Sequence, residues 1–166
     1  MKKLLLVLMA FCWMASPAIA QSFPDDEKAI IAVLDDFHDA AAKADKERYL
    51  GHFTDDGVFL GTDEWERWPL HPEFTEYVGG RFANGGWSYH SEEKNINFSK
   101  DGSLAWFDET SISNSNGGRF RGSGVLEKVD GNWKIAHYVL SFLVYNEVGG
   151  DVGKIIAAQK EKMDNN

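Results

Sequence analysis

One histidine stands out as a side chain that could carry out acid–base chemistry. His137 lies in the segment 133–141, which follows the turn Asp130-Gly131 and has the composition of a β-strand. On an alternating strand it would share a face with Trp133 and Ile135. An imidazole titrates near neutral pH and can accept or donate a proton. We therefore expect His137 to point inward, where it either lines a pocket or packs as a neutral core side chain.

Two adjacent carboxylates are the candidate partners of this histidine. Asp108 and Glu109 lie on a predicted strand, so they must point to opposite faces and at most one enters a cavity. A carboxylate in an apolar cavity has a raised pKa and can act as an acid or a base. The other is expected to be a solvated surface charge.

Arg121 begins a glycine-rich segment, residues 121–125. Glycines in a strand allow a backbone or a ligand to approach closely, and a guanidinium suits recognition of a carboxylate. Arg121 could therefore clamp an anionic substrate, or it could pair with Asp108 or Glu109. A two-residue turn at 130–131 would place Arg121 and His137 on opposite faces, whereas a three-residue turn with a bulge would place them on the same face.

The remaining ligand-binding candidates are mostly aromatic. Tyr49 and His52 lie three apart on a predicted helix and share a face. Charged residues and tryptophans between 63 and 68 could form a pocket rim, and other tryptophans could form its wall. Packing in the core or exposure at the surface is the alternative for each. The full candidate set is Tyr49, His52, Asp63, Trp68, Trp87, Trp106, Arg121 and His137.

Several motifs are missing from the sequence. There is no His-Glu-x-x-His, no cysteine pair and no acidic calcium loop, so no metal site is predicted. No phosphate-binding glycine loop or dinucleotide fingerprint occurs, so no cofactor is predicted. The spacing of Gly-x-Ser-x-Gly is also absent.

Helical patterns precede strand patterns along the chain. Apolar residues at helical spacing predict a helix over 26–44, a shorter one capped by Asp45, and a third over 72–82. Thr54-Asp55-Asp56-Gly57 is predicted to be a turn, followed by a short strand at 58–60. After residue 86 the period changes, and the predicted strands are 87–98, 104–112, 119–129 and 133–145.

Short turns between these strands predict an antiparallel meander, and helices grouped before such a sheet define an α+β domain. A strongly curved sheet wrapped around the helices would leave a cavity. Tyr138, Leu140, Phe142 and Val144 alternate on the last strand and are expected to form an apolar outer face that another chain covers. A final helix is predicted after Gly149-Gly150.

The first 20 residues have the features of a signal peptide. Two lysines precede an apolar run that is too short to span a bilayer, and Ala18-x-Ala20 supplies the small residues of a cleavage site. An uncleaved membrane anchor is the less favoured alternative. We expect residues 21–166 to be one exported domain, periplasmic or secreted, with 146–166 as a helical tail. Cleavage would also remove Cys12, the only cysteine.

The chain is acidic. Its net charge of −9 would become −11 after cleavage, because two of the 17 lysines and arginines lie in the signal peptide. Nucleic acids and anionic membranes attract basic surfaces, so neither is expected as a partner.

The order helix, helix, short strand, helix, four long strands resembles the nuclear transport factor two-like superfamily, and within it the SnoaL-like branch. The matching segments are 29–41 (AIIAVLDDFHDAA), 49–53 (YLGHF), 57–63 (GVFLGTD), 66–68 (ERW), 105–109 (AWFDE), 121–126 (RGSGVL) and 131–141 (GxWKIAHYxLS, where x marks a position outside the match). The resemblance implies a cone-shaped fold with an apolar pocket and a dimer formed through the outer sheet face. The superfamily includes polyketide cyclases, a steroid isomerase, dehydratases and binding proteins. Val139 stands where many relatives carry a second pocket histidine, which weakens a two-histidine mechanism.

Three functions follow as hypotheses. The first is an exported domain that binds a small, largely apolar organic molecule. The second is a cofactor-independent isomerase, cyclase or dehydratase that uses His137 with Asp108 or Glu109. The third is a homodimeric interaction module. Binding and dimerisation are compatible with each other.

Overall fold

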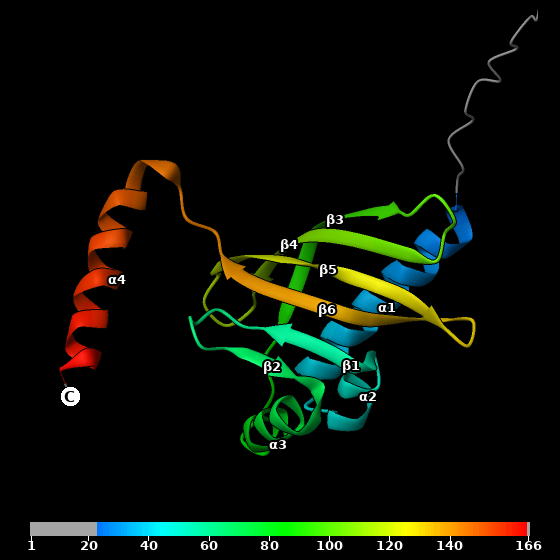
Figure 1. Ribbon diagram of the computed structural model, residues 1–166, viewed down its shortest axis with the longest axis horizontal. Coiled ribbons are helices and arrows are strands. Elements are labelled where there is room, and N and C mark those ends of the chain that lie inside the picture. The colour runs from blue at the N-terminus through cyan, green and yellow to red at the C-terminus, as the bar shows by residue number, and fades with distance from the viewer. Residues whose placement is uncertain (1–22, 166) are drawn as a thin grey trace, which may run out of the picture.

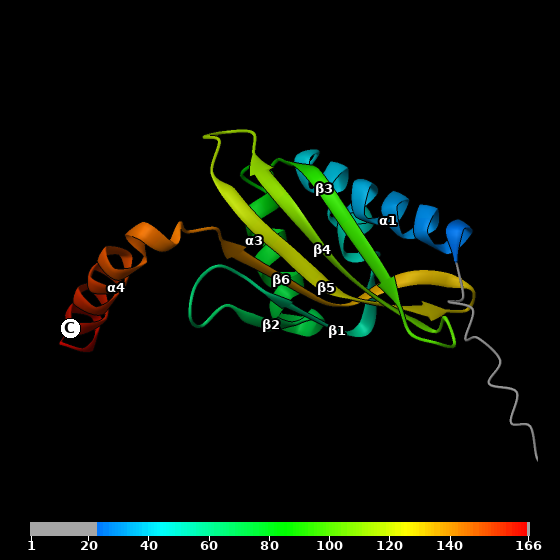
Figure 2. The same ribbon diagram turned by 90° about the horizontal axis from the view of Figure 1, so that it is seen from above.

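The computed structural model describes residues 23–165, so the expected signal peptide lies outside the described residues. Helices α1 (Pro24–Ala42), α2 (Lys46–Leu50) and α3 (Thr75–Phe82) pack on one side of a curved six-stranded sheet (Figures 1 and 2). The predicted α+β class and the curved sheet around the helices are confirmed.

The sheet has the strand order β2-β1-β6-β5-β4-β3. Its strands are β1 (Phe53–Leu60), β2 (Arg67–Pro69), β3 (Tyr89–Phe98), β4 (Leu104–Ser113), β5 (Arg119–Val129) and β6 (Asn132–Phe142). The last four form the predicted antiparallel meander. Strand β1 pairs in parallel with β6, which places the segment after α2 beside the last strand.

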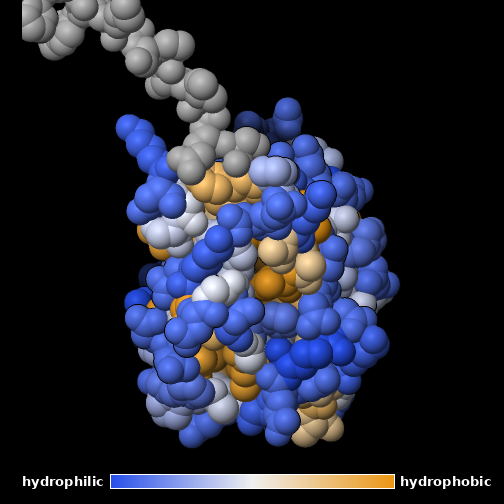
Figure 3. Space-filling model, turned by 90° about the vertical axis from the view of Figure 1, so that its right-hand side faces the viewer, coloured by the Kyte–Doolittle hydropathy of each residue, from blue (hydrophilic) through white to orange (hydrophobic). Residues whose placement is uncertain are grey.

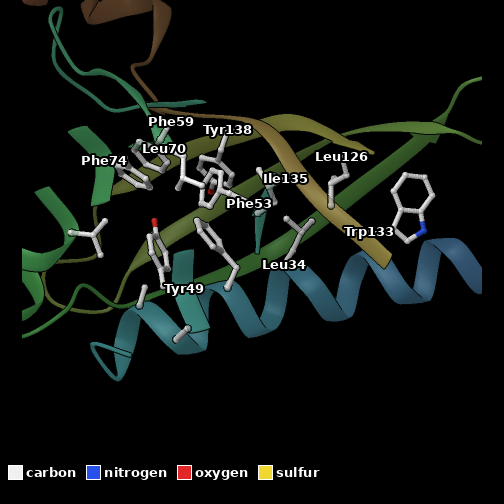
Figure 4. Close-up of a cluster of buried hydrophobic side chains, with 14 of the residues drawn as sticks. Leu34, Tyr49, Phe53, Phe59, Leu70, Phe74, Leu126, Trp133, Ile135 and Tyr138 are labelled. Carbon is white, nitrogen blue, oxygen red and sulfur yellow. The ribbon is translucent and has the colours of Figure 1, made fainter. Parts of the chain in front are cut away.

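Helix α1 lies along the concave side of the sheet and supplies much of the core. Its first turn holds a proline and three acidic residues, which favour the start of a helix. Ile30, Leu34 and Phe37 recur every three to four positions and are buried. Together with side chains from the sheet they form the apolar cluster in Figure 4.

Two local predictions are wrong. Residues 54–57 belong to strand β1 and do not form a turn, because this segment adds to the edge of β6 with an irregularity in register between Phe53 and Val58. The third helix begins at Thr75, later than predicted, because the chain is kinked over Leu70–Phe74.

A bulge in β6 reverses the predicted facing of its second half. The turn has two residues, and Val129 pairs with Asn132 as expected for one. Asp130 and Gly131 both have positive φ, 50° and 82°, as the common two-residue hairpin turns require. Leu126 then pairs with Ile135 but Val125 with His137, so Ala136 is an extra residue.

Because of this bulge Tyr138, and not His137, continues the inner face begun by Trp133 and Ile135. Gly124 makes the bulge sterically possible, because a Cβ there would clash with the His137 carbonyl oxygen. The predicted inward position of His137 is wrong. So is the predicted outer face of Tyr138, Leu140 and Phe142, since Tyr138 is buried and Leu140 packs against the core.

The C-terminal segment stands away from the rest of the molecule. After a short 3-10 turn (Asn146–Val148), α4 (Gly149–Asp164) extends beyond the sheet and buries no residue (Figures 1 and 2). Lys160 Nζ forms an ion pair with Glu64 in the β1–β2 loop, at 2.9 Å. None of the helices within residues 23–165 combines the length and apolarity needed to cross a bilayer.

The two ends of the sheet differ in their surroundings. At the end where α1 begins, which we call the closed end, Trp133 donates a hydrogen bond from its indole to Asp26 of α1 at 2.9 Å. The surface there is mostly hydrophilic, with smaller apolar areas between polar side chains (Figure 3). We call the opposite end, toward Phe142 and the β1–β2 loop, the open end.

Candidate functional site

Four polar side chains meet inside the sheet, and we call them the Glu109 cluster. Glu109 of β4 is fully buried. Its Oε1 contacts His38 Nε2 of α1 at 2.8 Å and accepts a hydrogen bond from Tyr138 of β6 at 2.8 Å. Its other oxygen accepts a hydrogen bond from Ser91 of β3. Four elements of the fold thus converge on one carboxylate, as a buried charge requires.

The protonation of the cluster follows from these contacts. Burial alone would raise the pKa of Glu109, but the hydrogen bond and charge of His38, together with Ser91 and Tyr138, hold it below its usual value. Burial, and then the Glu109 charge, raises the pKa of Tyr138 well above the ordinary value. Tyr138 therefore stays a hydrogen-bond donor, and Glu109 stays ionised at neutral pH.

Gly122 of β5 provides the space for this cluster. A Cβ at this position would lie 2.5 Å from the Tyr138 hydroxyl oxygen and 2.8 Å from Glu109 Cγ. Any side chain here would push the two groups apart. The glycines of segment 121–125 were predicted to allow a backbone or a ligand to approach closely. At Gly122 and Gly124 the groups that approach are other parts of the protein itself.

Among residues 23–165, two buried hydroxyls, those of Tyr49 and Ser111, make no hydrogen bond of good geometry; the polar groups next to them are the Trp87 indole and the Tyr138 hydroxyl, respectively. Tyr49 stacks on Phe37, with ring centroids 4.4 Å apart, and its hydroxyl points from α2 toward the sheet (Figure 4). Burial raises its pKa well above the usual value, with smaller contributions from Tyr77 and Tyr89. Buried hydroxyls that are only weakly hydrogen-bonded are uncommon.

A cavity of about 210 Å³ opens at the open end, and we call it the aromatic pocket. Its walls come from all the strands except β4, from α3, and from the loops around β2 and β3. The lining residues are Phe59, Gly61, Thr62, Glu66, Trp68, Tyr77, Arg81, Trp87, Tyr89, Phe120, Leu140 and Phe142.

The pocket touches the Glu109 cluster through one ring. Phe59 lines the pocket and stacks on Tyr138, with centroids 5.4 Å apart and the rings tilted by only 3°. Glu109 itself does not line the pocket. The cluster therefore lies behind the pocket wall and positions that wall through Tyr138.

Two of the predicted ligand-binding residues lie in this pocket. Trp68 stacks on Tyr77 at 4.2 Å between centroids, and Trp87 lies 6.3 Å from Tyr77. The sequence reasoning did not single out Tyr77, Arg81 or Phe120. Tyr77 and Arg81 are four apart on α3, and this spacing was the available signal for a shared face.

Three further candidates lie elsewhere. Tyr49 is in the core and does not reach the pocket surface. His52 contacts Asp36 at 2.8 Å in a separate depression near the closed end, and burial is the main cause that lowers its pKa. Asp63 is exposed in the β1–β2 loop, beside Trp65 and α4.

The other candidates are on the outer face of the sheet. Arg121 pairs with Asp108 there, at 3.4 Å, so Glu109 is the carboxylate that points inward. Through the bulge, Arg121 and His137 share a face, but it is the outer one. Trp106 is also on this face and 48% exposed. Of the proposed catalytic set, only Glu109 lies in the interior.

Within residues 23–165 no group of three or more histidines, cysteines or acidic residues is arranged to hold a metal ion.

The fold and this interior identify the class of protein. The model of the SnoaL-like domain matches residues 30–145, most of the chain. The chain therefore belongs to the SnoaL-like domain family. A search of curated proteins finds no match.

Solved structures with the same fold are distant in sequence. A domain of unknown function with a cystatin-like fold from Nostoc punctiforme has a TM-score of 0.69 and 17% identity, over 86% of this chain and 95% of its own. A nuclear transport factor two-like protein from Pseudomonas putida KT2440 has a TM-score of 0.66 and 15% identity, over 76% and 92%. A proposed scytalone dehydratase from Novosphingobium aromaticivorans has a TM-score of 0.61 and 17% identity, over 73% and 86%. At these identities the likeness is one of fold.

Proposed function

We propose that this protein binds a small, largely apolar organic molecule in the aromatic pocket. The observation that carries the proposal is a cavity of about 210 Å³ whose walls are mainly aromatic and whose polar groups are few. Small-molecule sites usually have this composition. An engineered apolar cavity of ~150 Å³ is enough to bind benzene, so this one has room for a single or fused ring.

The direct test places a tryptophan on either face of β6. One substitution fills the pocket, and the other, on the outer face, is the control. Leu140 lines the pocket, whereas its neighbour Val139 points to the outer face. Titration with indole, followed by isothermal calorimetry, should detect binding to the wild type and to Val139→Trp, and none to Leu140→Trp. Equal binding to both variants would place the indole elsewhere and remove the proposal.

The alternative function, a cofactor-independent isomerase, cyclase or dehydratase, has less support. Two of its candidate groups, His137 and Asp108, belong to the outer face. Glu109 is inside, but its oxygens are already engaged by three donors and its pKa is lowered, away from the near-neutral value that suits a general acid or base. Glu109 also does not line the pocket. The cluster is better suited to hold Tyr138 and the pocket wall in place.

Export and self-association remain part of the proposal. Export is supported by the basic start, the short apolar run and Ala18-x-Ala20. Sequencing of the mature N-terminus should begin at Gln21; a start at Met1 would contradict it. Self-association through the outer sheet face is supported by half-exposed Trp106. Light scattering on the eluting protein should give twice the chain mass for the wild type and the single mass for Trp106→Asp.

A further inference from the structure

Two groups of rings line the aromatic pocket. On the side of β2 and α3, Trp68 stacks on Tyr77. On the side of β3, β5 and β6, Phe120 contacts Tyr89 at 5.3 Å edge to face and Phe142 at 4.7 Å. Flat faces and edges of this kind favour a planar ring as the occupant, since aromatic pairs prefer offset or edge-to-face contact.

Arg81 adds a positive charge to this apolar wall. It lies one turn after Tyr77 on α3, and its side chain forms no hydrogen bond or ion pair with any residue from 23 to 165. Of the four other arginines between residues 23 and 165, three are paired: Arg48 with Asp39, Arg119 with Glu92, and Arg121 with Asp108. The fourth, Arg67, is exposed on β2, does not line the pocket and has no carboxylate partner among these residues either. In a chain with a net charge of −9, an arginine at a pocket without a carboxylate partner is conspicuous.

The pocket also contains one carboxylate, but the protein already uses it. Glu66 Oε2 accepts a hydrogen bond from the Asp63 backbone at 3.1 Å. The same side chain packs over Gly61, where a Cβ would clash with it. Glu66 is thus held against the backbone of the β1–β2 loop, whereas the guanidinium of Arg81 keeps its donors free.

We propose that the pocket selects small aromatic anions, with an aryl carboxylate as the simplest example. The ring lies among the aromatic side chains, and the carboxylate pairs with Arg81 at the mouth. The planar fork of a guanidinium matches a carboxylate through two parallel hydrogen bonds, which gives it preference over a neutral group of the same shape. This proposal rests on the proposed function, that the pocket binds a small molecule.

The test compares three probes of one shape and three charges: benzoate, benzyl alcohol and benzylamine. Affinities are measured by calorimetry with the full chain, its Arg81→Gln variant and Arg67→Gln as the control. Arg67 is an exposed arginine on β2, beside Trp68, and it does not line the pocket. Glutamine is shorter than arginine but keeps a similar helix propensity and a polar end, and it loses the charge.

We expect the wild type and Arg67→Gln to bind benzoate about tenfold more tightly than benzyl alcohol, and Arg81→Gln to bind the two equally. Equal affinity in the wild type, or a benzoate preference that survives in Arg81→Gln, would overturn the assignment while leaving the pocket a binding site. If benzylamine bound most tightly, the assignment would be overturned, because the pocket would then select a cation through Glu66. Failure of all three probes and of indole to bind would instead remove the proposed function.

Discussion

The closed and open halves of the interior share the long strands of the sheet yet differ in chemistry. Along the inner face of β4, Ala105 and Phe107 come first, toward the closed end, and Glu109, Ser111 and Ser113 follow toward the open end; all are buried. The inner face of β4 is apolar in the closed half. The open half contains the Glu109 cluster, the buried hydroxyls of Tyr49 and Ser111, and the aromatic pocket.

This difference separates stability from binding. Apolar burial in the closed half stabilises the fold in proportion to the apolar area removed from water, and it needs no specific partner. Buried polar groups cost free energy unless they are paired, so their presence in one half needs a reason. The pocket lies in the same half, and the Glu109 cluster positions its wall through Tyr138 and Phe59.

The largest expected effect is in the closed half. Leu34→Ala removes a fully buried side chain and should lower the free energy of unfolding by about 2–5 kcal/mol in urea titrations. Indole affinity of the folded variant should match the wild type. A large loss of affinity at equal folded fraction would contradict the separation of the two halves.

Glu109 is expected to matter through its partners. Glu109→Leu leaves His38, Ser91 and Tyr138 without their acceptor and should cost about 3 kcal/mol in the same measurement. Glu109→Gln keeps an acceptor oxygen and should cost about 1 kcal/mol. If Glu109→Leu has the same free energy of unfolding as Glu109→Gln, the cluster is not held together by the carboxylate.

Gly122 tests whether the cluster needs close approach. Gly122→Ala inserts a methyl group beside Tyr138 and Glu109 and should cost about 1–2 kcal/mol, with weaker indole binding. Gly153→Ala in α4 is the control, since its Cβ meets nothing within 4 Å and alanine favours helices. A tolerated alanine at 122 would show that the inner face is less tightly packed than described.

The smallest effect is a dependence of stability on pH. The pKa of Glu109 is lowered in the folded protein, so its contribution is complete above the unfolded value of 4.5 and is lost as the pH falls through the folded value. Other carboxyls with lowered pKa also contribute, among them Asp101, at about 2. The difference between wild type and Glu109→Gln should therefore shrink below pH 4.5. A difference independent of pH would contradict the ionised state of Glu109.

Much of the fold could be predicted because its signals are local. Apolar spacing identified α1, Asp45 caps α2 by accepting a hydrogen bond from the Arg48 backbone, and Asp130-Gly131 identified the turn between β5 and β6. The length of that turn, two or three residues, was left open by the sequence, and the structure has two. The β1 segment at 54–57 was missed, because its acidic residues resemble a turn and only pairing with β6 makes them a strand.

The site was harder to predict because a single residue changed its facing. Nothing in the side chain of Ala136 signals a bulge, yet the bulge turns His137 outward and Tyr138 inward. Asp108 and Glu109 were left undecided for another reason: alternation places adjacent residues on opposite faces but does not say which face is the inner one. Trp68 and Trp87 were candidates because of their residue type and they line the pocket, whereas Arg81 looks like any charged residue of a short surface helix.

The tryptophans provide the most direct test of the central claim, that the aromatic pocket at the open end is the binding site. Indole N–H signals can be followed by NMR during a titration with benzoate, with each signal assigned by Trp→Phe replacement. The signals of Trp68 and Trp87 should shift, whereas those of Trp106 on the outer face and Trp133 at the closed end should not. Shifts at Trp106 or Trp133 with Trp68 and Trp87 unchanged would contradict it.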